Sequence, residues 1–368
     1  MPLPFWLIPL AVKGVAVAAG AVGVGSAVHG AAKMVEANDT MKSANSRHEQ
    51  NMEKFEKENK QTSEDMDKLG KLELEVLSSF EEFSRVFEEI KNKPVFEDYS
   101  KNGITLPKYD HETLKKVYVG AAALLGSLGG AGLGVAGGFA AAGATAAAVM
   151  AFGTASTGTA IASLSGAALT NATLAALGGG ALAAGGGGMA AGAAVLGAAT
   201  LGVGLLVGGV IFNFTGGKLS DQADEAWAQM KKAEAQINKI CAYLVDLRKT
   251  ANDYFTTLFA VNEIYQRHLN GLKAIVDILG HTDWHTFTES EKKLTENTVL
   301  LLGLLYNMCK VELVLISENE DDINNINTEA VQKSINNANA VLADRFQYTK
   351  NTENVSEYID DEDESFYT

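Results

Sequence analysis

The feature that most constrains this chain is a run of 101 positions, residues 117–217, that contains no Asp, Glu, Lys or Arg. Ionised side chains bracket the run at Lys116 and Lys218, and it holds 27 of the chain's 37 glycines together with many Ala, Leu and Val residues. A helix on the surface of a soluble protein turns one polar face to water, and this stretch offers no charged face of that kind. The run therefore predicts either entry into a lipid bilayer or burial inside an assembly that shields it.

Glycine recurs at every fourth position in the first part of this segment. On a helix such glycines form a ridge without side chains, along which a second helix can approach closely even where lipid supplies no hydrophobic driving force. Glycine clusters and a polar turn at 153–158 divide the segment into predicted helices at about 117–151, 160–177 and 189–214. The predicted helix-packing residues are Gly126, Gly130, Gly134, Gly138, Gly188, Gly192, Gly204 and Gly208.

Weak hydrophobicity leaves two interpretations of the segment open. Glycine and alanine contribute little transfer free energy, and glycine costs an isolated helix about 1 kcal/mol relative to alanine. Such a segment suits a protein that is folded in a soluble form and then releases it into a membrane. The alternative is a permanent, tightly packed anchor that spans the membrane several times.

The rest of the chain has the pattern of long helices. Five prolines lie at or before position 107 and none follows, and no β-type alternation is present. Residues 33–93 form a long, highly charged helical region that carries an apolar stripe from Leu69 to Ile90. Its upstream part, 43–68, is interpreted as either an exposed helix or a flexible stem. After the segment, 220–278 carries a heptad-like seam that we expect to mediate stalk formation or oligomerisation. Its residues are Met230, Ile237, Ile240, Leu244, Leu247 and Leu258.

Helix signals continue to the end of the chain. Thr288-x-x-Glu291 is a capping box, and the helix that it begins is expected to run through 299–316. A last helix is expected at 328–346. Residues 350–368 hold seven acids against one lysine and predict a disordered, solvated tail.

These signals predict an all-α protein, an elongated helical bundle or stalk with a glycine-zipper, multi-helix apolar insertion. The apolar N-terminal stretch contains three prolines and an internal Lys13, so we expect a retained helix rather than a cleaved secretory signal. The expected parts are an apolar N-terminal helix at 1–32, a long amphipathic helix and loop at 33–116, membrane-inserting helices at 117–217, a helical bundle at 218–349 and the tail at 350–368.

No catalytic or metal-binding constellation is expected. The only local histidine cluster, His281 and His285 with Asp283, follows Gly280 in a predicted turn and lacks a further ligand. The motif of a phosphate-binding loop is missing as well. Cys241 and Cys309 are isolated in helical patterns and are predicted to be reduced and buried. We therefore expect no enzyme activity, no cofactor and no metal.

The layout resembles that of α-helical pore-forming toxins of the haemolysin E and tripartite enterotoxin kind, in which an apolar hairpin lies mid-chain between long helices. The likeness covers about residues 60–346. Separately, the Gly/Ala-rich stretch at 156–192 is similar to the hydrophobic segment of interferon-induced small membrane proteins, which implies a membrane-embedded segment. The chain also resembles bacterial proteins that pair such a segment with helical stalks.

The leading hypothesis is a bacterial, membrane-active protein that oligomerises through its glycine ridge and permeabilises a bilayer. Its partners would be lipid and further copies of the chain, or related helical subunits. A net charge of −15 argues against nucleic acid. The alternatives are a constitutive inner-membrane scaffold whose cytosolic bundle recruits a partner, and a soluble oligomer that buries the segment between subunits.

Overall fold

The computed structural model describes residues 24–96, 99–101, 104–106, 110–128, 219–315 and 323–346. Helices make up 84% of this part, and its strands are two residues long, so the predicted all-α fold class is confirmed. Most of the charge-free segment and the predicted acidic tail lie outside the described residues. The α-helices of the described part are α1 (Val24–Glu89), α2 (His111–Leu128), α8 (Leu219–Lys273), α9 (Glu289–Cys309) and α10 (Thr328–Phe346).

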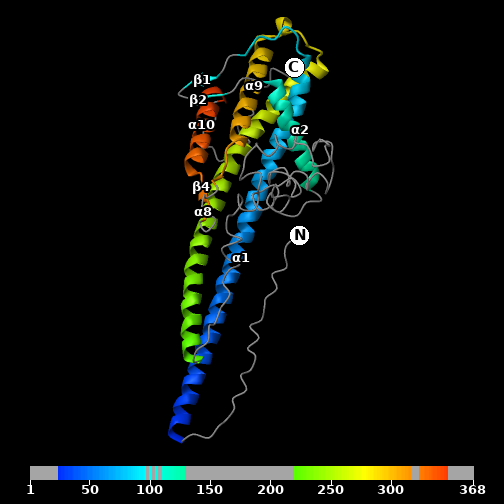
Figure 1. The fold of residues 1–368 in the computed structure, drawn as a ribbon. Coiled ribbons are helices and arrows are strands. Elements are labelled where there is room, and N and C mark those ends of the chain that lie inside the picture. Colours follow the sequence, from blue (N-terminus) through cyan, green and yellow to red (C-terminus); the bar gives the residue numbers. More distant parts are fainter. Residues whose placement is uncertain are drawn as a thin grey trace, which may run out of the picture.

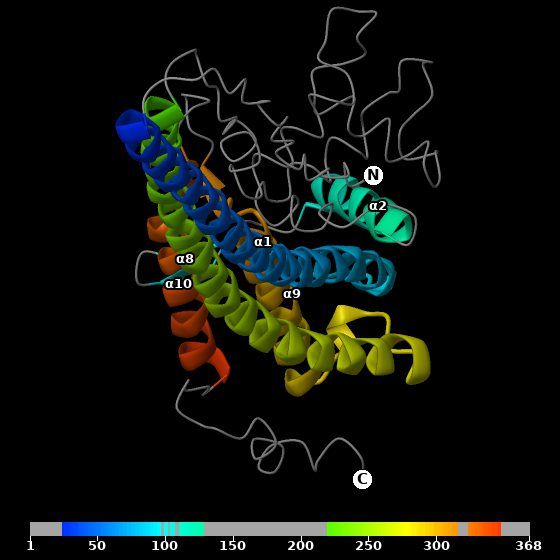
Figure 2. The same ribbon diagram turned by 90° about the horizontal axis from the view of Figure 1, so that it is seen from below.

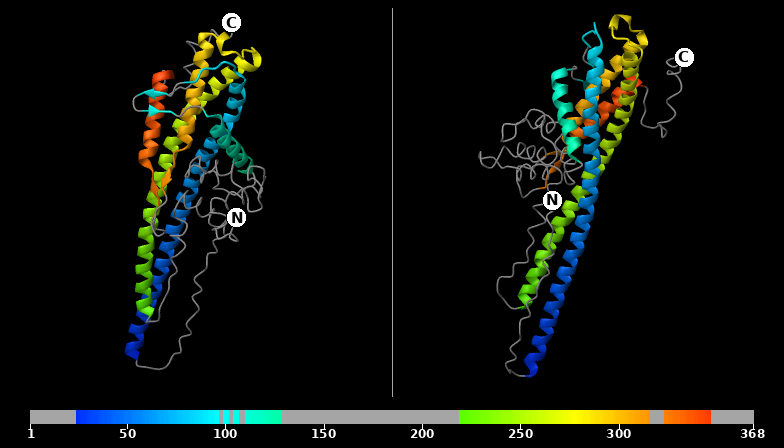
Figure 3. Two further views of the ribbon diagram at one scale, coloured as in Figure 1. Left: turned by 45° about the horizontal axis from the view of Figure 1, so that its top comes forward. Right: turned by 90° about the vertical axis from the view of Figure 1, so that its right-hand side faces the viewer.

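Two long helices, α1 and α8, lie side by side and set the length of the molecule (Figures 1 and 3). At 1.5 Å per residue, the 66 residues of α1 extend over about 100 Å. The helix continues without a break through 43–68, which decides for a helix over a flexible stem there, and it crosses the predicted boundary between residues 32 and 33. No proline interrupts it, and Pro94 follows shortly after its end.

The shorter helices surround the upper half of this pair. Seen from below, α2 lies on one side of α1, whereas α9 and α10 lie on the side of α8 (Figure 2). The large apolar core is located here, where Phe80, Phe83 and Tyr254 are fully buried among side chains of α1, α8, α9 and α10. Among the described residues, the lower half holds a small cluster built around Phe55 and Leu244, together with Met230 and buried alanines. The two halves therefore differ in how many helices support them.

The loops at the upper end join α1 to the turn between α8 and α9. A π-helical turn, Ala274–Ile278, follows α8, and Gly280 then adopts a φ of 71°, as the predicted turn requires. The Lys91 amide donates to the Thr282 carbonyl at 2.7 Å, and the Trp284 amide donates to the Lys91 carbonyl at 3.0 Å. The upper ends of the two long helices are thereby held by backbone hydrogen bonds.

Two predicted helix boundaries are wrong. The helix expected to start at residue 117 begins six residues earlier, because the Leu114 amide already bonds the Asp110 carbonyl at 2.9 Å. The helix expected to run through 316 ends at Cys309. Beyond it, Val314–Leu315 (β3) pairs antiparallel with Asn325–Ile326 (β4), and Leu313 is fully buried. The β-branched and apolar residues of this stretch suit a strand as well as a helix, and the pairing decides between them.

Other predicted boundaries are confirmed. The last helix, α10, occupies Thr328–Phe346, as expected. Helix α8 and its π-helical turn together span the predicted 220–278 almost residue for residue. A second two-residue hairpin, Ser100–Lys101 (β1) with Ile104–Thr105 (β2), lies in the loop between α1 and α2. Lys101 and Tyr99 of this loop bond Asp344 of α10, so the loop is tied to the far side of the core.

Candidate functional site

The predicted seam of α8 is buried against α1 within one chain. Its six residues are at most 3% exposed, and they lie along the interface of the two long helices. In the lower half, Ile237, Ile240 and Leu244 pack with Phe55 of α1. The apolar repeat of α8 thus faces a helix of the same chain, and these side chains are not offered to a second subunit while α1 stays in place.

The two helices run parallel. Arg47 Nε donates to Glu234 Oε1 at 3.0 Å, and Thr62 Oγ1 donates to the Leu244 carbonyl at 3.1 Å. At the upper end, Arg85 bonds Asp277. The sequence separation of these pairs stays between 182 and 192 along the whole rod, which requires that both helices rise in the same direction. The colours of the ribbon show the same course, since both helices begin at the lower end (Figure 1).

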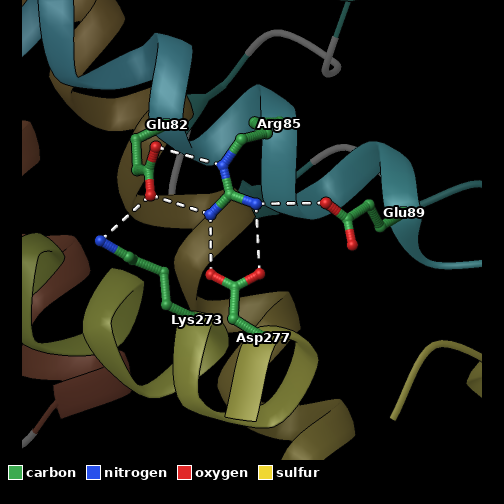
Figure 4. A network of polar contacts seen from close by, with 5 residues as sticks. All are labelled: Glu82, Arg85, Glu89, Lys273 and Asp277. Atoms are coloured by element: carbon green, nitrogen blue, oxygen red, sulfur yellow. Dashed lines mark hydrogen bonds and ion pairs between the residues drawn. The ribbon is translucent and has the colours of Figure 1, made fainter. Parts of the chain in front are cut away.

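A network of charged side chains fixes the axial register of α1 and α8 at their upper ends. The Arg85 guanidinium bonds both carboxylate oxygens of Asp277, at 2.7 and 3.1 Å, and also bonds Glu82 and Glu89 of its own helix (Figure 4). Hydrogen bonds from Arg85 and then Lys273 lower the pKa of Glu82 to about 2. These groups are about one-third to one-half exposed, so water screens the attraction, and the forked geometry specifies register more than it adds stability.

The charge-free segment joins the rod at two different levels. Helix α2 runs antiparallel to α1 (Figure 1): His111 Nδ1 lies 3.0 Å from Ser84 Oγ, and Tyr118, further along α2, bonds Ser84 and is near enough to Glu81 to interact with its charge. Helix α8 begins near the other end, where Trp227 stacks under the Arg47 guanidinium at 5.9 Å. The levels of Glu81 and Arg47 on α1 are about 50 Å apart at 1.5 Å per residue. The two ends of the segment therefore do not meet at one base of the rod, because α1 and α8 run parallel and α8 begins near their lower end.

One of the eight predicted helix-packing glycines falls within the described residues. Gly126 lies in the last turns of α2. The other seven, and with them the glycine ridge, lie outside the described residues. Within the described ranges, no helix combines the length and the apolar character that a membrane crossing needs.

The histidine cluster has a structural role at the start of α9. His281 Nδ1 lies 2.7 Å from Glu291 Oε1, and the other oxygen of Glu291 accepts from the Thr288 amide at 2.7 Å. The Thr288 hydroxyl accepts from the Glu291 amide, which completes the predicted capping box. Burial raises the pKa of Glu291, but the hydrogen bonds from Thr288 and His281 outweigh it, and the net shift is downward. Among the described residues, no group of His, Cys, Asp and Glu is arranged to hold a metal ion.

Replacing the cap residue tests this account of α9. We expect Thr288→Ala to lower the free energy of unfolding by about 1 kcal/mol, because the Glu291 amide loses its side-chain acceptor. Ser290→Ala, an exposed position in the same helical turn, serves as the matched control and should change stability by less than about 0.5 kcal/mol. Urea denaturation followed by circular dichroism measures both. Equal midpoints for the two variants would contradict the role of the cap.

One buried ionisable residue escaped the sequence analysis. Glu73 is fully buried on α1, and its carboxylate oxygens have no hydrogen-bond partner among the described residues. The signal was available, because Glu73 follows Leu69 by four positions and precedes Val76 by three, which places it on the apolar stripe. Cys309, buried as predicted, lies against it, with Sγ 3.9 Å from the Glu73 carbonyl oxygen. Burial raises the pKa of both groups well above their ordinary values.

Comparison of the chain with protein-family models, with curated proteins and with solved structures gave no match. The resemblances in layout and composition to pore-forming toxins and to small membrane proteins therefore remain resemblances.

Proposed function

We propose that this chain is a membrane-active protein whose segment 117–217 enters a lipid bilayer and permeabilises it, with α1 and α8 as the stalk outside. The single observation that carries the proposal is the run of 101 residues without an ionised side chain. Apart from the part of α2 that follows Lys116, the described helices are charged and amphipathic, so the polar and apolar parts of the chain are separated along its length.

The packing of the described helices supports this division. The main core draws its buried side chains from α1, α8, α9 and α10, with a contribution from the start of α2. Phe80, Tyr254 and Leu305 are all buried in this cluster of the described residues. A stalk of this kind remains folded when the segment changes its surroundings, which is what a protein that inserts only part of its chain requires.

Assembly is expected to use the glycine ridge. The seam of α8 is already covered by α1, so a second copy can reach it only if the pair separates. Glycines at every fourth position provide a close-packing surface inside a bilayer, where van der Waals contact replaces the hydrophobic effect. The proposed partners are accordingly lipid and further copies of this chain.

Dye release from liposomes tests the function. We expect the purified full-length chain to release an entrapped dye, and a Gly130→Leu, Gly134→Leu double variant to release it at least about tenfold more slowly, because two leucines hold neighbouring helices apart. The matched control is Gly132→Leu with Ala136→Leu, which adds similar bulk, also four residues apart, on the opposite face of the predicted helix. Intact liposomes with the unmodified chain, or equal release by the two double variants, would overturn the proposal.

A second candidate, a constitutive membrane scaffold, has an observation in its favour. Three large apolar side chains are exposed at the upper end of the rod: Val95 is 84% exposed, Ile278 79% and Leu279 59%. Apolar side chains at a tip suit contact with a partner protein. Cell fractionation separates the two candidates. A chain that is recovered in water before any trigger supports the pore former, and one that requires detergent throughout supports the scaffold.

A further inference from the structure

A carboxyl group lies where four helices meet. Glu73 belongs to α1 and is fully buried, as are its neighbours Leu69 and Leu77. Across from it, Cys309 ends α9, and the Tyr254 hydroxyl of α8 donates to the Met308 carbonyl at 2.7 Å. Tyr254 also lies 3.0 Å from Ser334 Oγ of α10. We refer to Glu73, Tyr254, Cys309 and Ser334 as the Glu73 junction.

Nothing in this junction compensates a negative charge. Helix α8 contributes the Tyr254 phenol, α9 contributes the Cys309 thiol and α10 contributes the Ser334 hydroxyl, and none of these groups is a cation. The charged neighbours on α1 itself, Lys71 and Glu75, are more than half exposed and pair with each other at 3.7 Å. Burial is the only cause that shifts the pKa of Glu73, and it shifts that pKa upward. An unpaired carboxylate in such a place is costly, so the packed junction holds the neutral acid.

We propose that Glu73 is a proton-operated latch: the junction stays closed while Glu73 keeps its proton, and loss of that proton separates α9 from α1. The opening is expected at α9 because α1 packs far more extensively on α8 than on α9. The parallel pair is also held by ion pairs and hydrogen bonds from Arg47 to Asp277, whereas the contact of α9 with α1 passes through the apolar surface around Glu73. Opening this side brings the carboxylate to water with the least loss of buried surface.

The direction of the pH effect follows from proton binding. The packed junction binds the proton of Glu73 more tightly than the open one, since the open one exposes the carboxyl to water. The stabilisation is fully present below the ordinary pKa of 4.5 and is lost as the pH rises through the raised pKa. Between these two values the equilibrium constant for opening increases up to tenfold per pH unit. The device therefore favours the closed form in acid and the open form toward alkaline pH.

This inference concerns the stalk and can hold without any membrane activity. Only its use as the control that frees the apolar segment rests on the function proposed above. The test is accordingly made in buffer without lipid, on the full-length chain, so that its result and the liposome result are independent.

The two native cysteines provide the measurement and its internal control. Cys309 lies in the junction, and Cys241 lies in the lower cluster with Phe55 and Leu244; both are buried and free. The labelling rate of each thiol is measured from pH 5 to 9 and divided by the rate of the same thiol in denaturant at the same pH. This division removes the titration of the thiol itself and leaves the equilibrium constant for opening.

For the unmodified chain we expect the normalised rate of Cys309 to rise up to tenfold per pH unit, and that of Cys241 to stay nearly constant. Glu73→Gln, which keeps the shape but cannot ionise, should make the rate of Cys309 independent of pH. Glu75→Gln, an exposed position two residues away, should leave the slope unchanged. A flat Cys309 profile in the unmodified chain, the same slope after Glu73→Gln, or a parallel rise of Cys241 would overturn the latch. The ratio of the normalised labelling rates of Cys309 and Cys241 in the unmodified chain tests the latch even if the Glu73→Gln variant does not fold.

Discussion

Replacing Phe80 by alanine is expected to lower the free energy of unfolding by about 3–5 kcal/mol, the usual cost of emptying a buried phenylalanine site. Phe80 is fully buried in the main core, where its ring meets that of Tyr265 edge-to-face with the centroids 6.0 Å apart. It lies on α1 and Tyr265 lies on α8, so the cavity would open between the two long helices. Urea denaturation of the full-length chain, followed by circular dichroism, gives the change in stability.

Phe259→Ala is the matched control for this experiment. Phe259→Ala removes the same kind of side chain from α8. Phe259, however, is 46% exposed, and its ring stacks on that of Phe255 with the centroids 6.0 Å apart. Loss of the Phe259 ring should lower the free energy of unfolding by about 1 kcal/mol or less, because a half-exposed site leaves little empty volume inside the protein. If the two variants lost equal stability, the upper core would not be the part that holds the described fold together.

Leu244→Asp is expected to separate the lower halves of α1 and α8 while the upper core stays folded. Leu244 is fully buried in the small apolar cluster with Phe55 and Ile240. An uncompensated charge in such a place costs about 3–5 kcal/mol. Because each lower half has one helix as its main described neighbour and isolated helices are marginal in water, both halves should lose their structure together.

Hydrogen exchange read by mass spectrometry locates this effect. Amide protection should fall in α1 below residue 60 and in α8 below residue 247, and it should persist around Phe80 and Tyr265. Lys239→Asp introduces the same side chain at an exposed position of α8 and should leave protection unchanged. Uniform loss of protection along both helices would show that the rod is one cooperative unit and would contradict the division into two halves.

Local patterns were sufficient to predict the buried face of α8, the start of α9 and the bounds of α10. The seam of α8 repeats every three or four positions, and all six of its predicted residues are buried. The capping box at Thr288 and the bounds of α10 depend on interactions within a few residues, and both agree with the structure. Such features are determined by the sequence alone because the contacts that produce them are between near neighbours in the chain.

The tertiary structure decided in which direction each helix runs, what packs on its apolar face and how deeply that face is buried. A stripe of apolar residues shows which side of α8 is covered, but the same stripe fits a parallel or an antiparallel neighbour, from the same chain or from another. Only the long-range pairs from Arg47 to Asp277 establish the parallel course, and with it the separate levels at which the charge-free segment joins the rod. The burial of Glu73 likewise depends on packing against other helices, which bring Tyr254 of α8 and Cys309 of α9 to it. Periodicity thus shows which face of a helix is apolar. The free energy of a buried charge or of a strand pair depends instead on the residues that pack against it, and these are distant in the sequence.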